Sequence, residues 1–148
     1  MLTNEGPKVI EFNCRFGDPE AQVILPRLKS DLLDLILLHC NQKQESAVVS
    51  FSDDVAVTVV MANKGYPGTY KNNSIITNID DVPLNKNSFI YHSGTAMNQH
   101  GQIIAKGGRV LSVTAKAKSY EKARLRAYDT VSKIKWENGF FRTDIANY

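Results

Sequence analysis

The second half of the sequence alternates short apolar segments with turn-forming residues, and this pattern constrains the fold more than any other feature of the chain. Five segments have the composition of β-strands: residues 55–61, 75–79, 89–92, 102–105 and 109–114. Glycine, proline and asparagine residues lie between them and favour turns. The pattern predicts a β-rich lobe.

An amphipathic helix should follow these strands. Ser119 is a suitable N-cap, and apolar residues then recur at steps of three and four positions: Tyr120, Ala123, Ala127, Val131 and Ile134. A helix with one apolar stripe buries that stripe against a neighbouring surface. We therefore expect a helix over residues 119–134 that covers the sheet.

Two shorter helices are predicted ahead of the strands. Asp18 suits an N-cap and Pro19 the first helical position, and Pro26 should end or kink that helix. A second helix should start at residues 30–31 and continue through the apolar residues 32–38. We expect this second helix, the strands and the final helix to cover one another in a two-layer α+β arrangement.

Residues 8–13 have the pattern of the second strand of an opening hairpin. Alternation places Glu11, Asn13 and Arg15 on a polar face, and the apolar residues between them on a core face. A carboxylate and an amide two residues apart offer oxygens to one hard cation, and a nearby guanidinium can hold phosphate oxygens. This arrangement fits a magnesium–phosphate site, although a strand with one solvated face has the same pattern.

Composition and charge indicate a folded chain of ordinary kind. The 148 residues suffice for one domain or two small lobes, and 43% hydrophobic with 22% charged residues is typical of globular proteins. The formal net charge is +3, and basic residues cluster only between Lys116 and Lys135. Aromatic and basic residues do not interleave, so we expect no nucleic-acid partner and favour small anionic ligands.

Cysteine usage and hydropathy bear on the cellular compartment. Cys14 and Cys40 lie far apart in sequence, without the spacing of a zinc site or a redox pair, which fits a reducing cytoplasm. The most apolar stretch is far too short to span a bilayer, and no signal-peptide pattern is found. We expect a cytoplasmic protein with no membrane partner.

A dodecapeptide at residues 9–20, Val-Ile-Glu-Phe-Asn-Cys-Arg-Phe-Gly-Asp-Pro-Glu, resembles a signature of the phosphoribosylamine-glycine ligases, which belong to the ATP-grasp superfamily. The resemblance continues over almost the whole chain, at residues 25–32, 65–68, 92–95, 107–111 and 141–145. It implies the C-terminal portion of such a ligase. Residues 1–41 would form the end of the ATP-grasp domain, with its metal-binding strand and helices. Residues 42–148 would form the β-rich C-terminal domain with its covering helix.

The resemblance also implies an activity. The family is an ATP-dependent carbon–nitrogen ligase that joins glycine to 5-phosphoribosylamine through an acyl phosphate, a step of de novo purine biosynthesis. ATP would be the co-substrate and Mg²⁺ or Mn²⁺ the cofactor. The remaining ATP-binding lobe and the N-terminal domain would lie upstream of Met1. We therefore expect little activity from these 148 residues alone.

Residue roles follow from the same resemblance. Glu11 and Asn13 match the two metal-binding positions, and Arg15 matches a catalytic arginine that would stabilise phosphate or acyl phosphate. Asp18 would bind substrate, although simple helix capping also accounts for it. Arg109 follows two glycines and would lie near the phosphate of phosphoribosylamine, with a surface arginine in a hairpin as the alternative.

A second function class is a non-catalytic binding or assembly module derived from such a ligase. Apolar surface that no upstream lobe covers would favour partner binding or a homo-oligomer.

Overall fold

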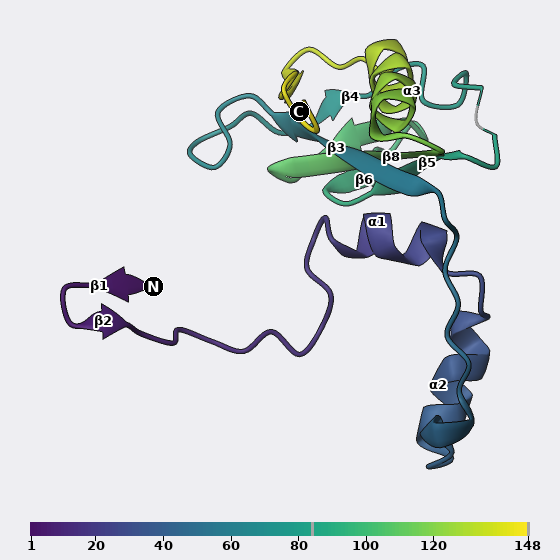
Figure 1. Cartoon of the computed structure of the whole chain (residues 1–148). Coiled ribbons are helices and arrows are strands. Elements are labelled where there is room, and N and C mark those ends of the chain that lie inside the picture. The colour runs from purple at the N-terminus through teal and green to yellow at the C-terminus, as the bar shows by residue number, and fades with distance from the viewer. Residues whose placement is uncertain (84, 148) are drawn as a thin grey trace.

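The computed structural model of the chain describes residues 1–83 and 85–147 (Figure 1). Its centre is an antiparallel sheet of four strands in the order β5 (Ser88–His92), β8 (Arg109–Ala117), β3 (Val55–Asn63) and β9 (Gly139–Phe141). The pair β3–β8 is the longest, with Val57 opposite Ala115 and Val59 opposite Val113, and its register shifts between Met61 and Ala62. The α+β fold class is confirmed.

The helix α3 (Tyr120–Lys133) covers one face of this sheet, as predicted (Figure 1). The Ser119 hydroxyl accepts a hydrogen bond from the Lys122 amide, which confirms the N-cap. Small and branched side chains fill the interface and are almost fully buried: Val59, Leu111, Val113, Ala115, Ala123, Ala127 and Val131. Since these residues bury their apolar surface completely, this layer is the principal core of the described chain.

A second helical layer lies on the opposite face of the sheet and consists of α1 (Ala21–Ile24) and the 3₁₀ turn η1 (Leu25–Arg27). The Thr114 hydroxyl lies 3.0 Å from the Gln22 carbonyl oxygen, and Lys116 Nζ donates to the Pro26 carbonyl at 2.6 Å. The sheet therefore has helices on both faces, and the predicted two-layer arrangement is wrong. As predicted, the α-helix does not continue through Pro26.

The predicted N-cap of the first helix is also wrong. The cap position is Glu20, whose side chain accepts a bond from the Gly17 amide at 2.7 Å instead of capping the helix. The Asp18 carboxylate is occupied elsewhere, because it accepts from Gln22 Nε2 and forms an ion pair with a distant arginine. An aspartate engaged by side chains does not satisfy the first amides of a helix.

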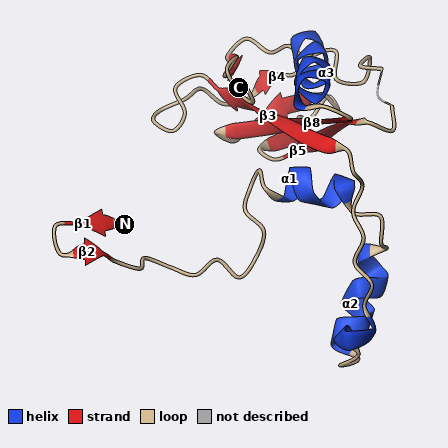
Figure 2. Ribbon diagram, viewed as in Figure 1, coloured by secondary structure: helices blue, strands red, loops and turns tan. Residues whose placement is uncertain are grey.

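The helix α2 (Leu32–Cys40) does not pack on the sheet, contrary to expectation (Figures 1 and 2). Its predicted start at residues 30–31 is confirmed, and Asp31 is the N-cap, since its side chain accepts from the amides of Leu33 and Asp34. Backbone bonds between residues 27–29 and 50–52 hold the helix, followed by η2 (Gln44–Ser46), on an arm that leads away from the sheet. None of its residues is buried, and Leu33 is 62% exposed. A helix that is apolar on all sides needs several neighbours, and one sheet face does not provide them.

The chain begins with a short hairpin of β1 (Leu2–Thr3) and β2 (Gly6–Pro7), but the strand predicted at residues 8–13 is not formed. That segment is extended loop (Figure 2). Ile10 is 73% and Phe12 84% exposed, so the face expected to be core is uncovered. The physical reason is the absence of a neighbouring strand in the described chain, since backbone groups form a strand only with a pairing partner.

A small second sheet contains β4 (Ser74–Ile75), β7 (Ile103–Ala105) and β6 (Thr95–Met97). β6 and β9 were not predicted, and the strand predicted at residues 75–79 ends at Ile75. Asn78 has a φ of 63°, in the left-handed region, which interrupts an extended strand. In the described part of the chain, no helix has the length and apolarity needed to cross a membrane.

The buried side-chain amide of Asn63 connects three segments of the core. Asn63 has no exposed surface, accepts a hydrogen bond from Trp136 Nε1 at 2.8 Å, and donates from Nδ2 to the Gly107 carbonyl at 2.8 Å. The backbone amide of Asn63 donates to the Gly108 carbonyl at 2.8 Å. This residue therefore fixes the Gly107–Gly108 turn to β3 and to the segment after α3.

Replacing Asn63 by alanine should lower the free energy of unfolding by about 2–4 kcal/mol, because a buried indole N–H and a half-buried carbonyl lose their partners. Urea unfolding followed by circular dichroism measures the change. Asn72→Ala, at an exposed position, is the control and should change stability by no more than about 0.5 kcal/mol. Equal losses in the two variants would contradict this role for Asn63.

Candidate functional site

The structure brings together the two residues predicted to bind substrate, Asp18 and Arg109. Arg109 Nη2 lies 3.1 Å from Asp18 Oδ2, and Arg109 Nη1 donates to the Asp18 carbonyl oxygen at 2.9 Å, across 91 positions of sequence. The two side chains remain 40% and 42% exposed. The loop before α1 and the start of β8 thus meet at an accessible, charged point on the surface.

Close backbone packing positions Arg109. A Cβ atom on Gly94 would lie 2.5 Å from the Arg109 carbonyl oxygen, and one on Gly108 would lie 2.2 Å from Cδ2 of Tyr66. The Gly94 amide donates to the Arg109 carbonyl at 3.0 Å. No side chain fits at these two glycines, so the turn before β8 has little freedom and presents the arginine at its start.

Glu11 and Asn13 lie side by side, with Asn13 Nδ2 donating to Glu11 Oε1 at 3.4 Å. Both are exposed. Carboxylate and amide oxygens are suitable ligands for Mg²⁺ or Mn²⁺, so the donor chemistry fits the predicted metal. The number of donors is low, because the described residues hold no group of three or more His, Cys, Asp or Glu side chains placed for a metal. Further ligands would have to come from phosphates, water or other protein segments.

Arg15 stands apart from the Asp18–Arg109 pair. Its Nη1 donates to the neighbouring Phe16 carbonyl at 3.0 Å, and the side chain is exposed. In the described chain, no hydrogen bond or ion pair joins Glu11, Asn13 or Arg15 to Asp18 or Arg109. The predicted site residues therefore form two groups in this structure.

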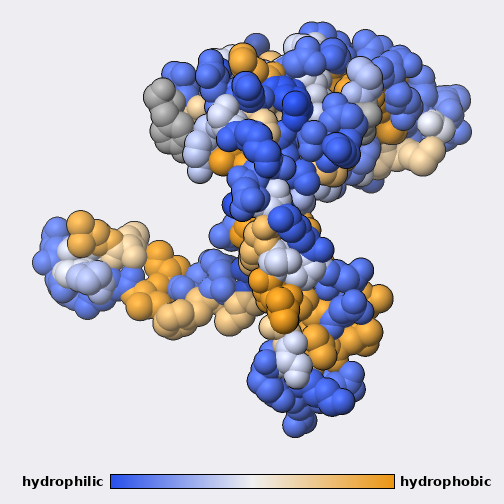
Figure 3. Space-filling model, turned by 45° about the vertical axis from the view of Figure 1, so that its right-hand side comes forward, coloured by the Kyte–Doolittle hydropathy of each residue, from blue (hydrophilic) through white to orange (hydrophobic). Residues whose placement is uncertain are grey.

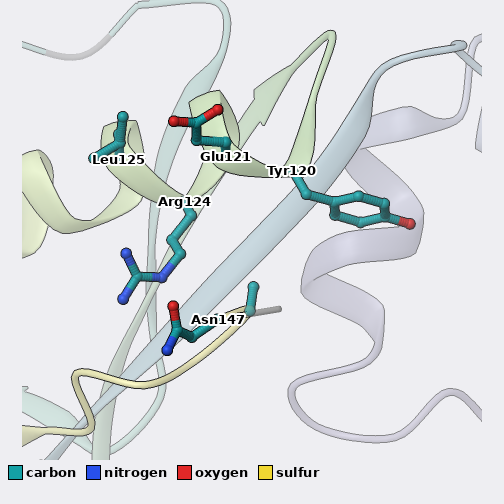
Figure 4. Close-up of a pocket in the computed structure, with 6 residues that line it drawn as sticks. Tyr120, Glu121, Arg124, Leu125 and Asn147 are labelled. Atoms are coloured by element: carbon teal, nitrogen blue, oxygen red, sulfur yellow. The ribbon is translucent and has the colours of Figure 1, made fainter.

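A large hollow of about 740 Å³ lies elsewhere, between α3 and the C-terminal segment, and none of the predicted site residues lines it (Figure 4). Arg124 projects into this region, and it donates to the carbonyls of Thr143 and Ile145 at 2.7 and 2.9 Å. Its guanidinium also lies 4.8 Å from the centre of the Tyr128 ring. Arg124 thus holds the C-terminal segment against α3.

Sequence reasoning missed the groups that support Arg109, namely Asn63, Gly94 and Trp136. An asparagine at the end of an apolar strand is an available signal, since a buried amide requires partners. The sequence contains no indication of which partners it would find.

An antiparallel sheet with helices on both faces defines an α+β domain, and an exposed arginine–aspartate pair lies at the start of its inner strand β8. Residues 56–148 match the family described as phosphoribosylglycinamide synthetase, C domain, and the chain belongs to this family.

Similar proteins carry the same name in plants and bacteria. The chain is 48% identical over 140 residues to the chloroplastic phosphoribosylamine–glycine ligase of Arabidopsis thaliana, a match that covers 94% of this chain and 26% of that protein. It is 45% identical to the phosphoribosylamine–glycine ligase of Agrobacterium fabrum, over 98% of this chain and 34% of that protein. The crystal structure of the Thermotoga maritima phosphoribosylamine–glycine ligase aligns with a TM-score of 0.77 and 30% identity, covering 98% of this chain and 35% of that one.

The chain thus spans about a third or less of the length of these relatives. It is also 45% identical to the trifunctional purine biosynthetic protein adenosine-3 of Gallus gallus, where it covers 14% of the length.

Exchanging Asp18 for asparagine should lower the free energy of unfolding by less than about 1 kcal/mol, because an ion pair exposed to this degree is largely screened by water. Chemical unfolding of the 148-residue chain tests this expectation. A loss well above 2 kcal/mol would show that the pair is mainly structural.

Proposed function

We propose that this chain forms the C-terminal part of an ATP-dependent ligase that joins 5-phosphoribosylamine and glycine in purine biosynthesis. The family membership and the similarity of almost the entire chain to phosphoribosylamine–glycine ligases support the proposal. The structural observation that carries it is the approach of Asp18 to Arg109 at an accessible surface. These two residues, both expected at the substrate from the resemblance, are neighbours in space.

In this proposal Arg109 holds the phosphate of phosphoribosylamine. A planar guanidinium can donate two parallel hydrogen bonds to phosphate oxygens. Before phosphate binds, Asp18 orients the guanidinium through its contacts with Nη1 and Nη2. Because the pair is exposed and weak, a dianionic phosphate can take over the Nη groups at small cost. The Asp18 carboxylate would then be available to a cationic group, such as the amine of a substrate.

Glu11, Asn13 and Arg15 would act at the ATP phosphates and the acyl phosphate. Glu11 and Asn13 would hold Mg²⁺ or Mn²⁺, which neutralises phosphate charge when bound. Arg15 carries no ion pair in the described chain, so its charge is free to stabilise a phosphoryl group. Phosphoryl transfer depends mainly on such positioning and charge neutralisation.

The apolar arm around α2 indicates where another part of the ligase would contact this chain. Large apolar side chains are exposed along one face of the helix, at positions Leu32, Leu33, Ile36 and Leu37. The orange surface in Figure 3 gathers over this arm and over the extended segment near the N-terminus. We assign the upstream part of the ligase to this surface, since the relatives are about three times longer than the chain. The upstream part of the ligase would also provide the neighbouring strand that residues 8–13 lack.

The alternative of a non-catalytic binding or assembly module rests on the same exposed arm, with self-association as its simplest form. A cytoplasmic location, predicted from the sequence, stays a prediction. The two functions differ in one measurable respect, because only the ligase requires Glu11 and Arg109 for turnover.

In a complete ligase that contains this segment, Glu11→Gln should lower the rate of ADP release by about a hundredfold while the fold is kept. A metal ion supplies several kcal/mol of charge stabilisation, and the amide holds it less strongly than the carboxylate. The assay supplies ATP, magnesium, glycine and freshly made phosphoribosylamine.

The matched control is Glu137→Gln, an exposed carboxylate at a position to which no function is assigned, which should leave the rate unchanged. The 148-residue chain alone should release no ADP. Unchanged turnover in Glu11→Gln would remove this residue from the mechanism, and ordinary turnover by the chain alone would show that no upstream part is needed.

Arg109→Ala in the complete ligase should raise the Michaelis constant for phosphoribosylamine by about 10-fold to 100-fold, the loss expected for charged hydrogen bonds. The constants for ATP and glycine should change far less. Lys106→Ala removes an exposed positive charge three residues away and serves as the control. Equal effects of Arg109→Ala on all three constants would favour the simple surface arginine.

A further inference from the structure

A basic hollow lies at the far end of β8 from Arg109, where the strand leads into α3. It has a volume of about 330 Å³, and the charged residues that line it are Asp54, Lys86, Lys116, Lys118, Lys122 and Arg126. They come from the segment before β3, the loop before β5, the end of β8 and the first turns of α3. Five residues with cationic side chains and one with a carboxylate thus line this concavity, the basic hollow.

Three of these cations are anchored to the protein. Lys118 Nζ lies 2.7 Å from Asp54 Oδ1, Lys116 Nζ donates to the Pro26 carbonyl at 2.6 Å, and Arg126 Nη1 donates to the Lys116 carbonyl. Only the first of these contacts neutralises charge, because the other two acceptors are backbone carbonyls. Arg126 therefore keeps its positive charge beside the hollow, whereas the Lys116 ammonium is directed toward η1 on the other face of the sheet.

The other two cations are uncommitted. Lys86 and Lys122 are exposed, and their ammonium groups form no hydrogen bond or ion pair with the described residues. An ammonium group carries three donors, so two such groups beside a positive field are ready to bind an anion.

The backbone around the hollow is held firmly. The Lys116 amide donates to the Asn87 carbonyl at 2.8 Å, which joins the end of β8 to the loop before β5. The Ser119 hydroxyl caps α3 at the Lys122 amide. The bond from Arg126 to the Lys116 carbonyl ties α3 to the strand. The elements that carry the cations are thus already in place, which reduces the ordering cost of binding.

The single carboxylate is strongly influenced by its neighbours. Hydrogen bonds with Lys118 and Ser52 hold the pKa of Asp54 below its usual range. Asp54 is therefore ionised at neutral pH and competes with any anion for Lys118.

We propose that the basic hollow binds a small polyanion with at least two linked phosphate groups, such as pyrophosphate or the polyphosphate part of a nucleotide. The volume is near the lower limit of small-molecule sites and suits a compact ion. Two uncommitted ammonium groups, one from the loop before β5 and one from α3, match an anion with two separated charge centres. The hollow contains neither Asp18 nor Arg109, so it is independent of the proposed ligase site.

The test is calorimetric titration of the 148-residue chain with pyrophosphate, in metal-free buffer of low ionic strength so that screening is small. Saturable binding is expected. The double variant Lys86→Gln with Lys122→Gln should bind at least about tenfold more weakly, since two charged donors are lost. Circular dichroism verifies that the fold is kept.

The matched control is Lys43→Gln with Lys71→Gln, two exposed lysines away from the hollow that remove the same net charge. This control should change the affinity by less than about twofold, because screened charges at a distance contribute little. Asp54→Asn should have the opposite effect and strengthen binding by about threefold or more, since Lys118 is released and one repulsive charge is lost.

Four results would overturn the proposal: no saturable binding by the unaltered chain, equal weakening in the two lysine double variants, weaker binding by Asp54→Asn, or inorganic phosphate binding as tightly as pyrophosphate. Comparison of inorganic triphosphate with a nucleoside triphosphate shows whether the nucleoside adds affinity. All of these measurements are made without ligase turnover, so their outcome is separate from that of the proposed function.

Discussion

The antiparallel pairing of β3 with β8 is the contact on which the rest of the structure depends. It aligns two strands of nine residues, with alternate side chains on each face, so that α3 packs on one side and α1 with η1 on the other. The same pairing also determines the positions of the two groups of charged side chains. Arg109 stands at the first residue of β8, and the basic hollow forms where the strand ends. The two ends of one nine-residue strand thus carry two separate groups of charged side chains.

Two of the three predicted helix starts, which depend on local signals, were placed correctly from sequence, whereas the Asp18 cap was not. Ser119 caps α3 as expected, α2 starts where predicted, and the apolar spacing of α3 is that of a helix on a sheet. The elements that depend on distant partners were not predicted correctly. Residues 8–13 alternate as a strand should, but alternation does not provide the neighbour that a strand requires. The position of α2 was mispredicted for the same reason. Its residues show that the helix is apolar, but they do not show which surface it contacts.

The candidate site divides in the same way. Glu11 and Asn13 are two residues apart, so their proximity could be inferred from the strand-like spacing alone. The meeting of Asp18 with Arg109 could not, because 91 positions separate them and only the tertiary fold closes that distance. The resemblance to known ligases indicated both residues without showing that they touch. The support of the arginine by Gly94 and Asn63 follows from atomic packing, which no spacing rule describes.

The buried bond between Trp136 and Asn63 has a practical consequence for spectroscopy. Trp136 is the sole tryptophan of the sequence, is almost fully buried, and is linked through Asn63 to the carbonyl of Gly107, two residues before Arg109. Indole emission depends on the polarity and hydrogen bonding around the ring. The protein therefore contains a natural fluorophore beside the turn that presents its exposed arginine, and occupancy of that arginine can be followed optically without attaching a dye.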